Sequence, residues 1–175
     1  MRKITRAKPS ILEIIRDVGI PTPPKLKLIG LLESPEQDLY SFSCTTNTAL
    51  FKILEHFAES STNIRFISKN AVVNNRTWIQ ICTDPDSERL IQTIVRKRDI
   101  KSSIEKFTHQ HGMKILSLYP FKGDPWVVKC LFDSLLSRKI EILATNTASS
   151  VISCVIRKQD LPLAIRHLHS AFTFS

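Results

Sequence analysis

The sequence predicts an α+β protein in which one small unit occurs twice, each copy ferredoxin-like with the order βαββαβ, an antiparallel sheet and helices on one face. The first observation is an internal repeat, because apolar strands at 63–67 and 78–82 return as 139–143 and 151–156. The second is that a helical pattern follows each pair of strands, at the same offset of about 75 residues. Neither copy contains a catalytic constellation, so the repeat favours a sensor or regulator over an enzyme with one pocket.

The composition is typical of a soluble globular protein. With 175 residues, 42% of them hydrophobic, the chain can form one ordinary domain or two of about 70 residues. Its longest apolar runs have the length of strands, which predicts that nothing crosses a membrane. Residues 1–8 are basic, but no apolar segment follows them, so we expect no secretory signal and a cytoplasmic location.

The four cysteines, Cys44, Cys82, Cys130 and Cys154, all lie within apolar patterns and form no C-x-x-C pair. This placement predicts free, buried and reduced thiols. A disulfide framework is the less favoured alternative, since little else in the sequence is typical of a secreted protein.

The N-terminal residues 1–24 differ from the rest of the chain. Ser10 and Gly19 bracket an apolar helical pattern, and residues 21–24 are typical of a stiff proline-rich linker. An apolar strand is expected at 26–32, followed by a turn at 34–37.

The first unit begins after this turn. Thr46, Asn47 and Thr48 supply N-cap chemistry for its first helix, and residues 84–87 open its second. The expected elements are strand 39–44, helix 46–57, strands 64–68 and 78–83, and a helix to residue 95. We interpret 104–108 as a further strand with Gly112 in a hairpin turn, although a helix over 100–112 fits the local pattern nearly as well.

The second unit repeats the order. Its first helix has Asp124 as N-cap and Pro125 at the first helical position, after the turn residue Gly123. The expected elements are strand 115–118, helix 127–135, strands 140–145 and 151–156, and a last helix from residue 160 to 172.

Three segments resemble the regulatory region of aspartokinase, which is a tandem pair of ACT domains. Residues 139–156 and the closing helix at 166–172 are similar to its second unit. Residues 28–31 match the strand that precedes its first unit and that, in the family, crosses over to complete the second unit's sheet. The resemblance extends over residues 26–172. It implies three parts: a basic segment with linker at 1–24, a leading strand plus first ACT domain at 25–112, and a second ACT domain at 113–175.

The resemblance also implies a function. The chain has no glycine-rich phosphate loop and only four glycines, so it would be a regulatory subunit without a catalytic domain, and not an enzyme by itself. It would act in aspartate-family (lysine) biosynthesis with an aspartokinase catalytic subunit, as a homodimer, under allosteric control by a small amino acid such as lysine or threonine. No cofactor is implied.

Family members bind the effector carboxylate at the loop before the first helix of a unit. The matching residues are Thr46, Asn47 and Thr48 in the first unit and Gly123 and Asp124 in the second, with Lys69 and Asn70 across the first site. Lys69 would repel a lysine side chain and favour an acidic ligand. The simpler interpretation is that Thr46 and Asn47 only cap a helix and that Lys69 is solvated.

Two other function classes stay open. A pair of ACT domains without a ligand would serve as a dimerisation scaffold. A basic nucleic-acid-binding protein is suggested by the net charge of +9, but Trp78 is the one aromatic on the central strands, so a base-stacking platform is not expected. His109 and His111, like His167 and His169, are interpreted as surface histidines, so no metal site is expected.

Overall fold

The computed structural model describes residues 25–72 and 76–175. The predicted helix and linker within residues 1–24, and most of the predicted turn at 74–76, lie outside the described residues. We call residues 37–110 the first half, and residues 26–33 together with 113–174 the second half. The fold is a mixture of helices and mainly antiparallel strands, as predicted.

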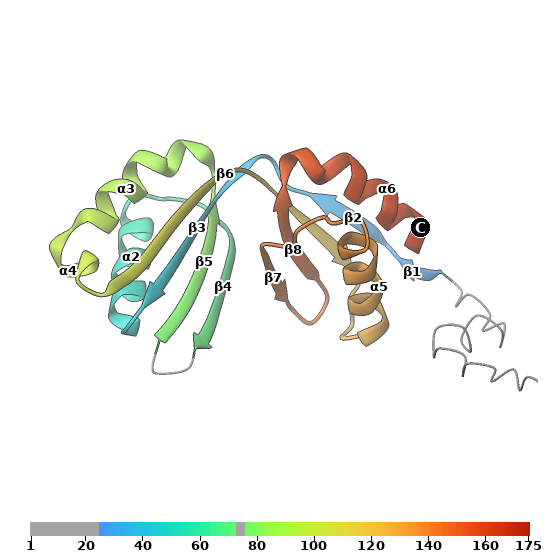
Figure 1. Cartoon of the computed structure of the whole chain (residues 1–175), viewed down its shortest axis with the longest axis horizontal. Coiled ribbons are helices and arrows are strands. Elements are labelled where there is room, and N and C mark those ends of the chain that lie inside the picture. Colours follow the sequence, from blue (N-terminus) through green and yellow to red (C-terminus); the bar gives the residue numbers. More distant parts are fainter. Residues whose placement is uncertain (1–24, 73–75) are drawn as a thin grey trace, which may run out of the picture.

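The first half contains a sheet whose strands run in the spatial order β4-β5-β3-β6 (Figure 1). All neighbouring strands in it are antiparallel. The elements in chain order are β3 (Gln37–Cys44), α2 (Asn47–Glu59), β4 (Ile64–Val72), β5 (Arg76–Thr83), the 3-10 turn η1 (Pro85–Ser87), α3 (Glu88–Arg96), α4 (Arg98–Lys101) and β6 (Ile104–Tyr119).

The second half continues the same sheet, in the spatial order β2-β6-β8-β7. A separate parallel pair joins β1 to β9 beside it. The elements are β1 (Leu26–Leu28), β2 (Gly30–Glu33), α5 (Pro125–Leu136), β7 (Ala144–Thr147), β8 (Ile152–Arg157), the 3-10 turn η2 (Lys158–Asp160), α6 (Leu161–Ala171) and β9 (Phe172–Phe174).

The strand β6 belongs to both halves, and the predicted hairpin turn at Gly112 is wrong. Residues 104–110 pair with β3, and residues 113–118 pair with β8, so the strand continues past Gly112 without reversing direction. Gly112 has φ of +69°, a conformation that glycine adopts at low cost. The local sequence signals a turn at this glycine, whereas the structure uses it to change the pairing partner.

The leading strand β2 pairs with the second half although it precedes the first half in sequence. Gly30 lies opposite Tyr119 in this pairing, and a side chain at Gly30 would place its Cβ 2.6 Å from the Tyr119 hydroxyl. A larger residue at this position would force the end of the Tyr119 side chain to move. The second half closes around a strand that the sequence places about 80 residues before β6.

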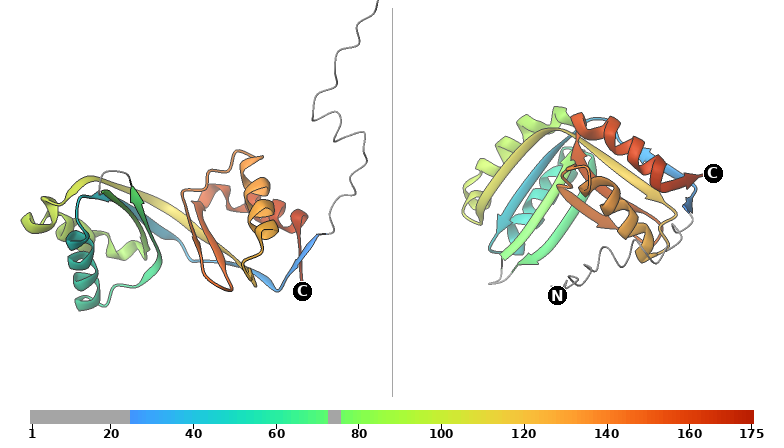
Figure 2. Two further views of the ribbon diagram at one scale, coloured as in Figure 1. Left: turned by 90° about the horizontal axis from the view of Figure 1, so that it is seen from below. Right: turned by 45° about the vertical axis from the view of Figure 1, so that its right-hand side comes forward.

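Figures 1 and 2 show an arch in which β6 and the segment between β2 and β3 cross at the apex, with α3 and α6 along the top. Each half has a core between its sheet and its helices. A third cluster fills the angle between the two half-sheets near the apex, and it buries Leu39, Phe66, Cys82, Met113, Ile115, Ala144 and Val155.

Strand β7 begins at Ala144, later than the predicted start at residue 140. The Ile140 N–H instead donates to the Leu135 carbonyl, at 3.1 Å, and closes the end of α5. Ile140 is buried among the residues between α5 and the sheet, so its apolar character reflects this helix-side packing and not a strand.

The four cysteines are free thiols, as predicted, and Cys44, Cys82 and Cys154 are buried; Cys130 is only half-buried, so the prediction of burial is wrong for this residue. Burial raises the pKa of Cys82 and Cys154 to about 12 and also raises that of Cys44 and Cys130. Because the thiolate is the reactive form, these side chains are packing residues. None of the helices within residues 25–72 and 76–175 has the length and apolar character that crossing a bilayer requires.

Candidate functional site

The N-terminus of α2 is open. Thr46 occupies the N-cap position with extended backbone, but its side chain makes no capping hydrogen bond. Residues 45–48 are exposed, and the first turn contains no acidic residue. The first backbone N–H groups of the helix are thus free to bind an anion such as a carboxylate.

Lys69 and Asn70 lie at the same end of the first half-sheet. Asn70 pairs with Trp78 on β5, and the neighbouring Thr77 pairs with Cys44, two residues before Thr46. The edge strand β4 is separated from β3 by one strand, which corresponds to about 10 Å. Figure 1 shows the tip of β4 and the start of α2 at the same lower edge of the molecule. The structure therefore brings these predicted residues to one end of the first half, with both side chains on β4 exposed.

The predicted residues Gly123 and Asp124 lie in the second half, at the start of α5. Asp124 accepts a hydrogen bond from the Trp126 N–H at 2.8 Å, which confirms the predicted N-cap. Its carboxylate already occupies the anion position of this helix. Gly123 has φ of +69° and open space where a Cβ would lie. The two predicted loops thus differ, since α2 is open and α5 is capped by its own chain.

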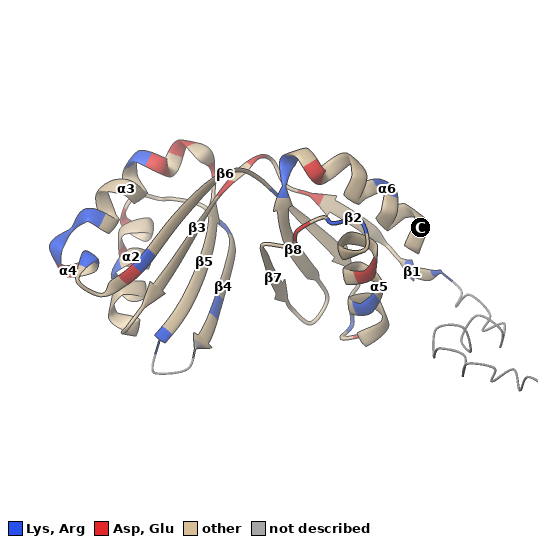
Figure 3. Ribbon diagram, in the orientation of Figure 1, with Lys and Arg blue, Asp and Glu red and all other residues tan. Residues whose placement is uncertain are grey.

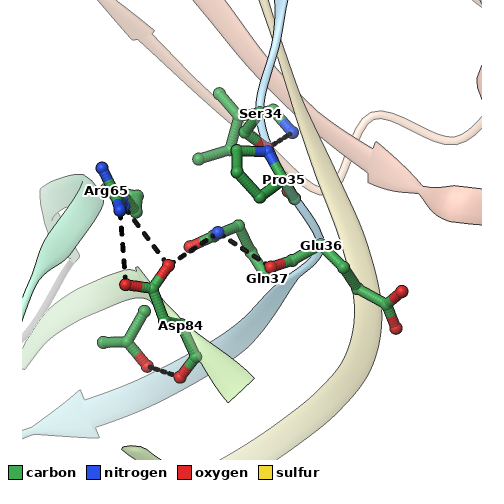
Figure 4. Close-up of polar contacts among 8 residues, drawn as sticks. Ser34, Pro35, Glu36, Gln37, Arg65 and Asp84 are labelled. Carbon is green, nitrogen blue, oxygen red and sulfur yellow. Dashed lines mark hydrogen bonds and ion pairs between the residues drawn. The ribbon is translucent and has the colours of Figure 1, made fainter. Parts of the chain in front are cut away.

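A polar network at the start of β3 was not predicted (Figure 4). The Gln37 amide donates to the Asp84 carboxylate at 3.1 Å and to the Glu36 carbonyl at 2.8 Å. Arg65 donates to the same carboxylate at 3.3 Å. Gln37 is fully buried, and its Oε1 is the one buried side-chain polar atom in the described part of the chain that has no hydrogen-bond partner. The network connects β3, β4 and the residue before η1. Gln37 and Asp84, which it joins, are 47 residues apart in sequence.

This network predicts a pH effect. The hydrogen bond from Gln37, and then the ion pair with Arg65, hold the pKa of Asp84 below its usual value. A lowered folded-state pKa contributes stability that is present above the unfolded value, near 3.9, and is lost as the pH falls through the folded value. We expect Asp84→Asn to lower the free energy of unfolding by about 1 kcal/mol at neutral pH. In urea unfolding, the difference from wild type should shrink at acid pH, while Asp86→Asn, an exposed neighbour, should change little at either pH.

Two hydrogen bonds join the halves inside the arch. The Gln80 amide donates to the Leu143 carbonyl at 2.9 Å, and the Asn146 amide donates to the Ile67 carbonyl at 2.8 Å. A cavity of about 260 Å³ lies at this junction of β4 and β7. The edge strands β4 and β7 of the two half-sheets therefore lie in contact.

A larger cavity, of about 720 Å³, lies where β6 crosses between the halves. Its basic residues are already paired, Arg157 with Glu141 at 2.8 Å and Lys158 with Glu36. His111 contributes to its wall. No local pattern in the sequence signals this cavity, because its walls come from β6, the end of β8, η2 and α6, which only the folded chain brings together.

The interpretation of both histidine pairs as surface residues is wrong for His109. Its side chain is 10% exposed and its Nε2 lies 2.9 Å from the Asp38 carboxylate. The His109 and His111 side chains both contact this carboxylate, which lies on the neighbouring strand β3. The alternation of side chains along a strand was the available signal, because residues two apart share a face.

The charged side chains do not form one continuous basic face. Figure 3 shows Lys and Arg gathered at α4 and otherwise scattered over both halves, with Asp and Glu between them. At α4 itself, Asp99 lies 2.7 Å from Lys52. In this view the positive charge is distributed over both halves, without a continuous basic run of the kind that tracks a phosphate backbone.

Comparison with known proteins finds no matching family model and no matching curated protein. Solved structures do match. The regulatory subunit of aspartate kinase from Thermus thermophilus, in a ligand-free form, superposes with a TM-score of 0.72 at 15% identity, over 83% of this chain and 99% of that one. The corresponding subunit from Thermus flavus gives 0.73 at 15% identity, over 83% and 99%.

Longer proteins contain the same fold as a part. Aspartate kinase from Synechocystis matches with a TM-score of 0.72 at 17% identity, over 85% of this chain and 28% of that one. The same overall fold thus recurs in proteins with little sequence in common. The chain has the fold of the aspartokinase regulatory subunits and regulatory domains.

Proposed function

We propose that this chain is an amino-acid-binding regulatory subunit of the aspartokinase type, built from two ferredoxin-like ACT domains: a leading strand plus the first domain at 25–112, and a second domain at 113–175 that the leading strand completes. The observation that carries the proposal is the match over 99% of a separate regulatory subunit, because it covers 83% of this chain and so cannot be confined to one half. Each half-sheet has the strand order of a ferredoxin-like unit, with β2 supplying the last strand of the second. Catalysis would reside on another chain.

The open N-terminus of α2 is the best candidate for the effector carboxylate. Its free N–H groups and the absence of an acidic first-turn residue favour an anion there. Thr46, Asn47 and Thr48 would surround the carboxylate. Lys69, opposite Ile79 and hence on the face of the sheet that α2 covers, would face the ligand's other end, whereas Asn70 points to the opposite face. The charge of Lys69 supports threonine or an acidic amino acid over lysine.

A second copy of the chain would complete this site. The edge strand β4 exposes Lys69 and Asn70, and the hydrogen bond from Asn146 engages this strand at Ile67, before these residues. Side-by-side packing of two chains would cover the free edge and place another subunit against the ligand. Ligand binding at such an interface would be coupled to the relative position of the subunits.

One observation favours the scaffold alternative for the second half. Asp124 fills the anion position of α5 with its own carboxylate, so Gly123 and Asp124 would form a structural loop and not a second ligand site.

The test is reconstitution with an aspartokinase catalytic chain that lacks a regulatory region. We expect a larger species in analytical ultracentrifugation, and phosphorylation of aspartate by the mixture that responds to threonine or an acidic amino acid more than to lysine. The catalytic chain alone should not respond. A complex without an effector response would support the scaffold, and the absence of both complex and response would contradict the proposal.

A further inference from the structure

The crossing point of β6 contains a cluster of metal-ligating side chains. A β-bulge in β6 lies opposite Asp38 of β3: Leu39 pairs with Gln110 but Gln37 pairs with Met113, so His111 and Gly112 both lie opposite the single residue Asp38. Bulges bend a strand and re-aim its side chains. Here His109 and His111, two residues apart on β6, both reach the Asp38 carboxylate.

We propose that Asp38, His109 and His111 form a binding site for a divalent transition-metal ion, Zn²⁺ in the first place. The Asp38 Oδ2 lies 2.9 Å from His109 Nε2 and 3.0 Å from His111 Nδ1, and the three ligand atoms all lie within 4.8 Å of one another. Zn²⁺ binds imidazole nitrogen and carboxylate oxygen at about 2.0–2.2 Å, which places neighbouring ligand atoms about 3.4 Å apart. Small side-chain rotations would open this cluster to that spacing.

The burial of Asp38 supports a cationic occupant. Its side chain is 3% exposed, and its ion pairs within the described residues are with the two histidines alone, without lysine or arginine. Buried carboxylates are ordinarily paired with a cation or bound to a metal. The Tyr40 hydroxyl, 3.5 Å from Asp38 Oδ2, adds only a neutral donor.

His109 has the neighbours that are typical of a histidine whose ring is held in position to bind a metal. Its other ring nitrogen, Nδ1, lies 3.7 Å from the Glu88 carboxylate at the start of α3. Its ring stacks on Tyr40, with centroids 4.3 Å apart. Metal-binding histidines commonly have a carboxylate at the second nitrogen, which fixes the tautomer and the ring orientation.

The third ligand leaves the site open on one side. His111 is 63% exposed and lines the cavity of about 720 Å³ at the crossing point. Three protein ligands leave a fourth tetrahedral position for water or another small ligand. A bound ion would fasten β6 to β3 at the place where β6 passes from one half to the other.

The test is a Zn²⁺ titration of the full chain, freed of metal with EDTA, by isothermal calorimetry. We expect one equivalent to bind, with a rise in melting temperature that EDTA reverses, and Co²⁺ should give the visible absorption of a tetrahedral site. His111→Ala should lower the affinity at least tenfold. Glu88→Gln should lower it roughly tenfold, since a carboxylate beside the second ring nitrogen of a metal-bound histidine commonly contributes that much.

His169→Ala is the matched control, because His167 and His169 have the same spacing but lie on α6. It should leave Zn²⁺ affinity unchanged. His111 is exposed, so its variant is expected to fold even where Asp38→Asn does not. The proposal is overturned if wild type and His111→Ala bind Zn²⁺ equally, or if no equivalent binds, in which case the cluster is only a hydrogen-bond network. Neither result depends on the proposed regulatory function.

Discussion

A chain that begins at Ser34 is expected to lose the fold of its second half, whereas a chain that begins at Lys25 is expected to keep it. The two chains differ only in residues 25–33, which form β1 and β2. Without them, β6 loses its antiparallel partner on one side, and β9 loses its parallel partner. The second-half core also loses Leu28, which is buried, and the partly buried Leu26 and Leu31.

The expected size of this effect follows from the buried area. A fully buried leucine contributes about 1.5–3 kcal/mol and a partly buried one less, so Leu28, the two partly buried leucines and the lost strand pairing together amount to roughly 5 kcal/mol. This equals a large share of the 5–15 kcal/mol that stabilises an ordinary domain.

Hydrogen exchange of the two chains measures the effect by region. In the shorter chain, amides of β8 and α6 should lose protection while those of β3 and β5 keep it. Equal protection of β8 in both chains would contradict the assignment of β2 to the second half.

The second large effect is expected in the first half. Phe42→Ala should lower the free energy of unfolding by about 3–5 kcal/mol, because Phe42 is fully buried between the sheet and the helices of the first half. Its ring also packs against Phe107 on β6, with centroids 5.4 Å apart. Removing it leaves a cavity on the side of the sheet covered by α2 and α3.

Phe51→Ala is the matched control on the same half. Phe51 lies on α2 but is 67% exposed, so its truncation should change stability by no more than about 0.5 kcal/mol. Chemical denaturation of both variants checks the pair. A similar cost at both positions would contradict the packing of β3 against these helices.

The repeat was visible in the sequence because each strand and helix has its own periodicity. The strands at Ile79 and Val155, and the helices at Ile53 and Leu131, are buried where their apolar patterns predicted. The N-cap at Asp124 could also be predicted from the local sequence, since it depends only on the Asp124 side chain and the backbone N–H two residues later.

The features that could not be predicted from the sequence depend on pairing between residues that are far apart along the chain. Gly112 has the same local signal in a hairpin turn and in a bulge, and only the partner strands distinguish them. Asp38 meets His109 although 71 residues separate them, and Gln37 meets Asp84 across 47. The effector residues Thr46 and Lys69 were suggested by resemblance, and their role stays a prediction.

The measurement that tests the central claim most directly is the thermal stability of the purified chain against each of the twenty amino acids at millimolar concentration. A sensor should respond to one amino acid, or to a small related group. A ligand at 100 times its dissociation constant adds about 2.7 kcal/mol to the free energy of unfolding, a clear rise in melting temperature. We expect such a selective shift, reduced by Lys69→Ala. A flat panel over all twenty would contradict the claim that this chain senses an amino acid.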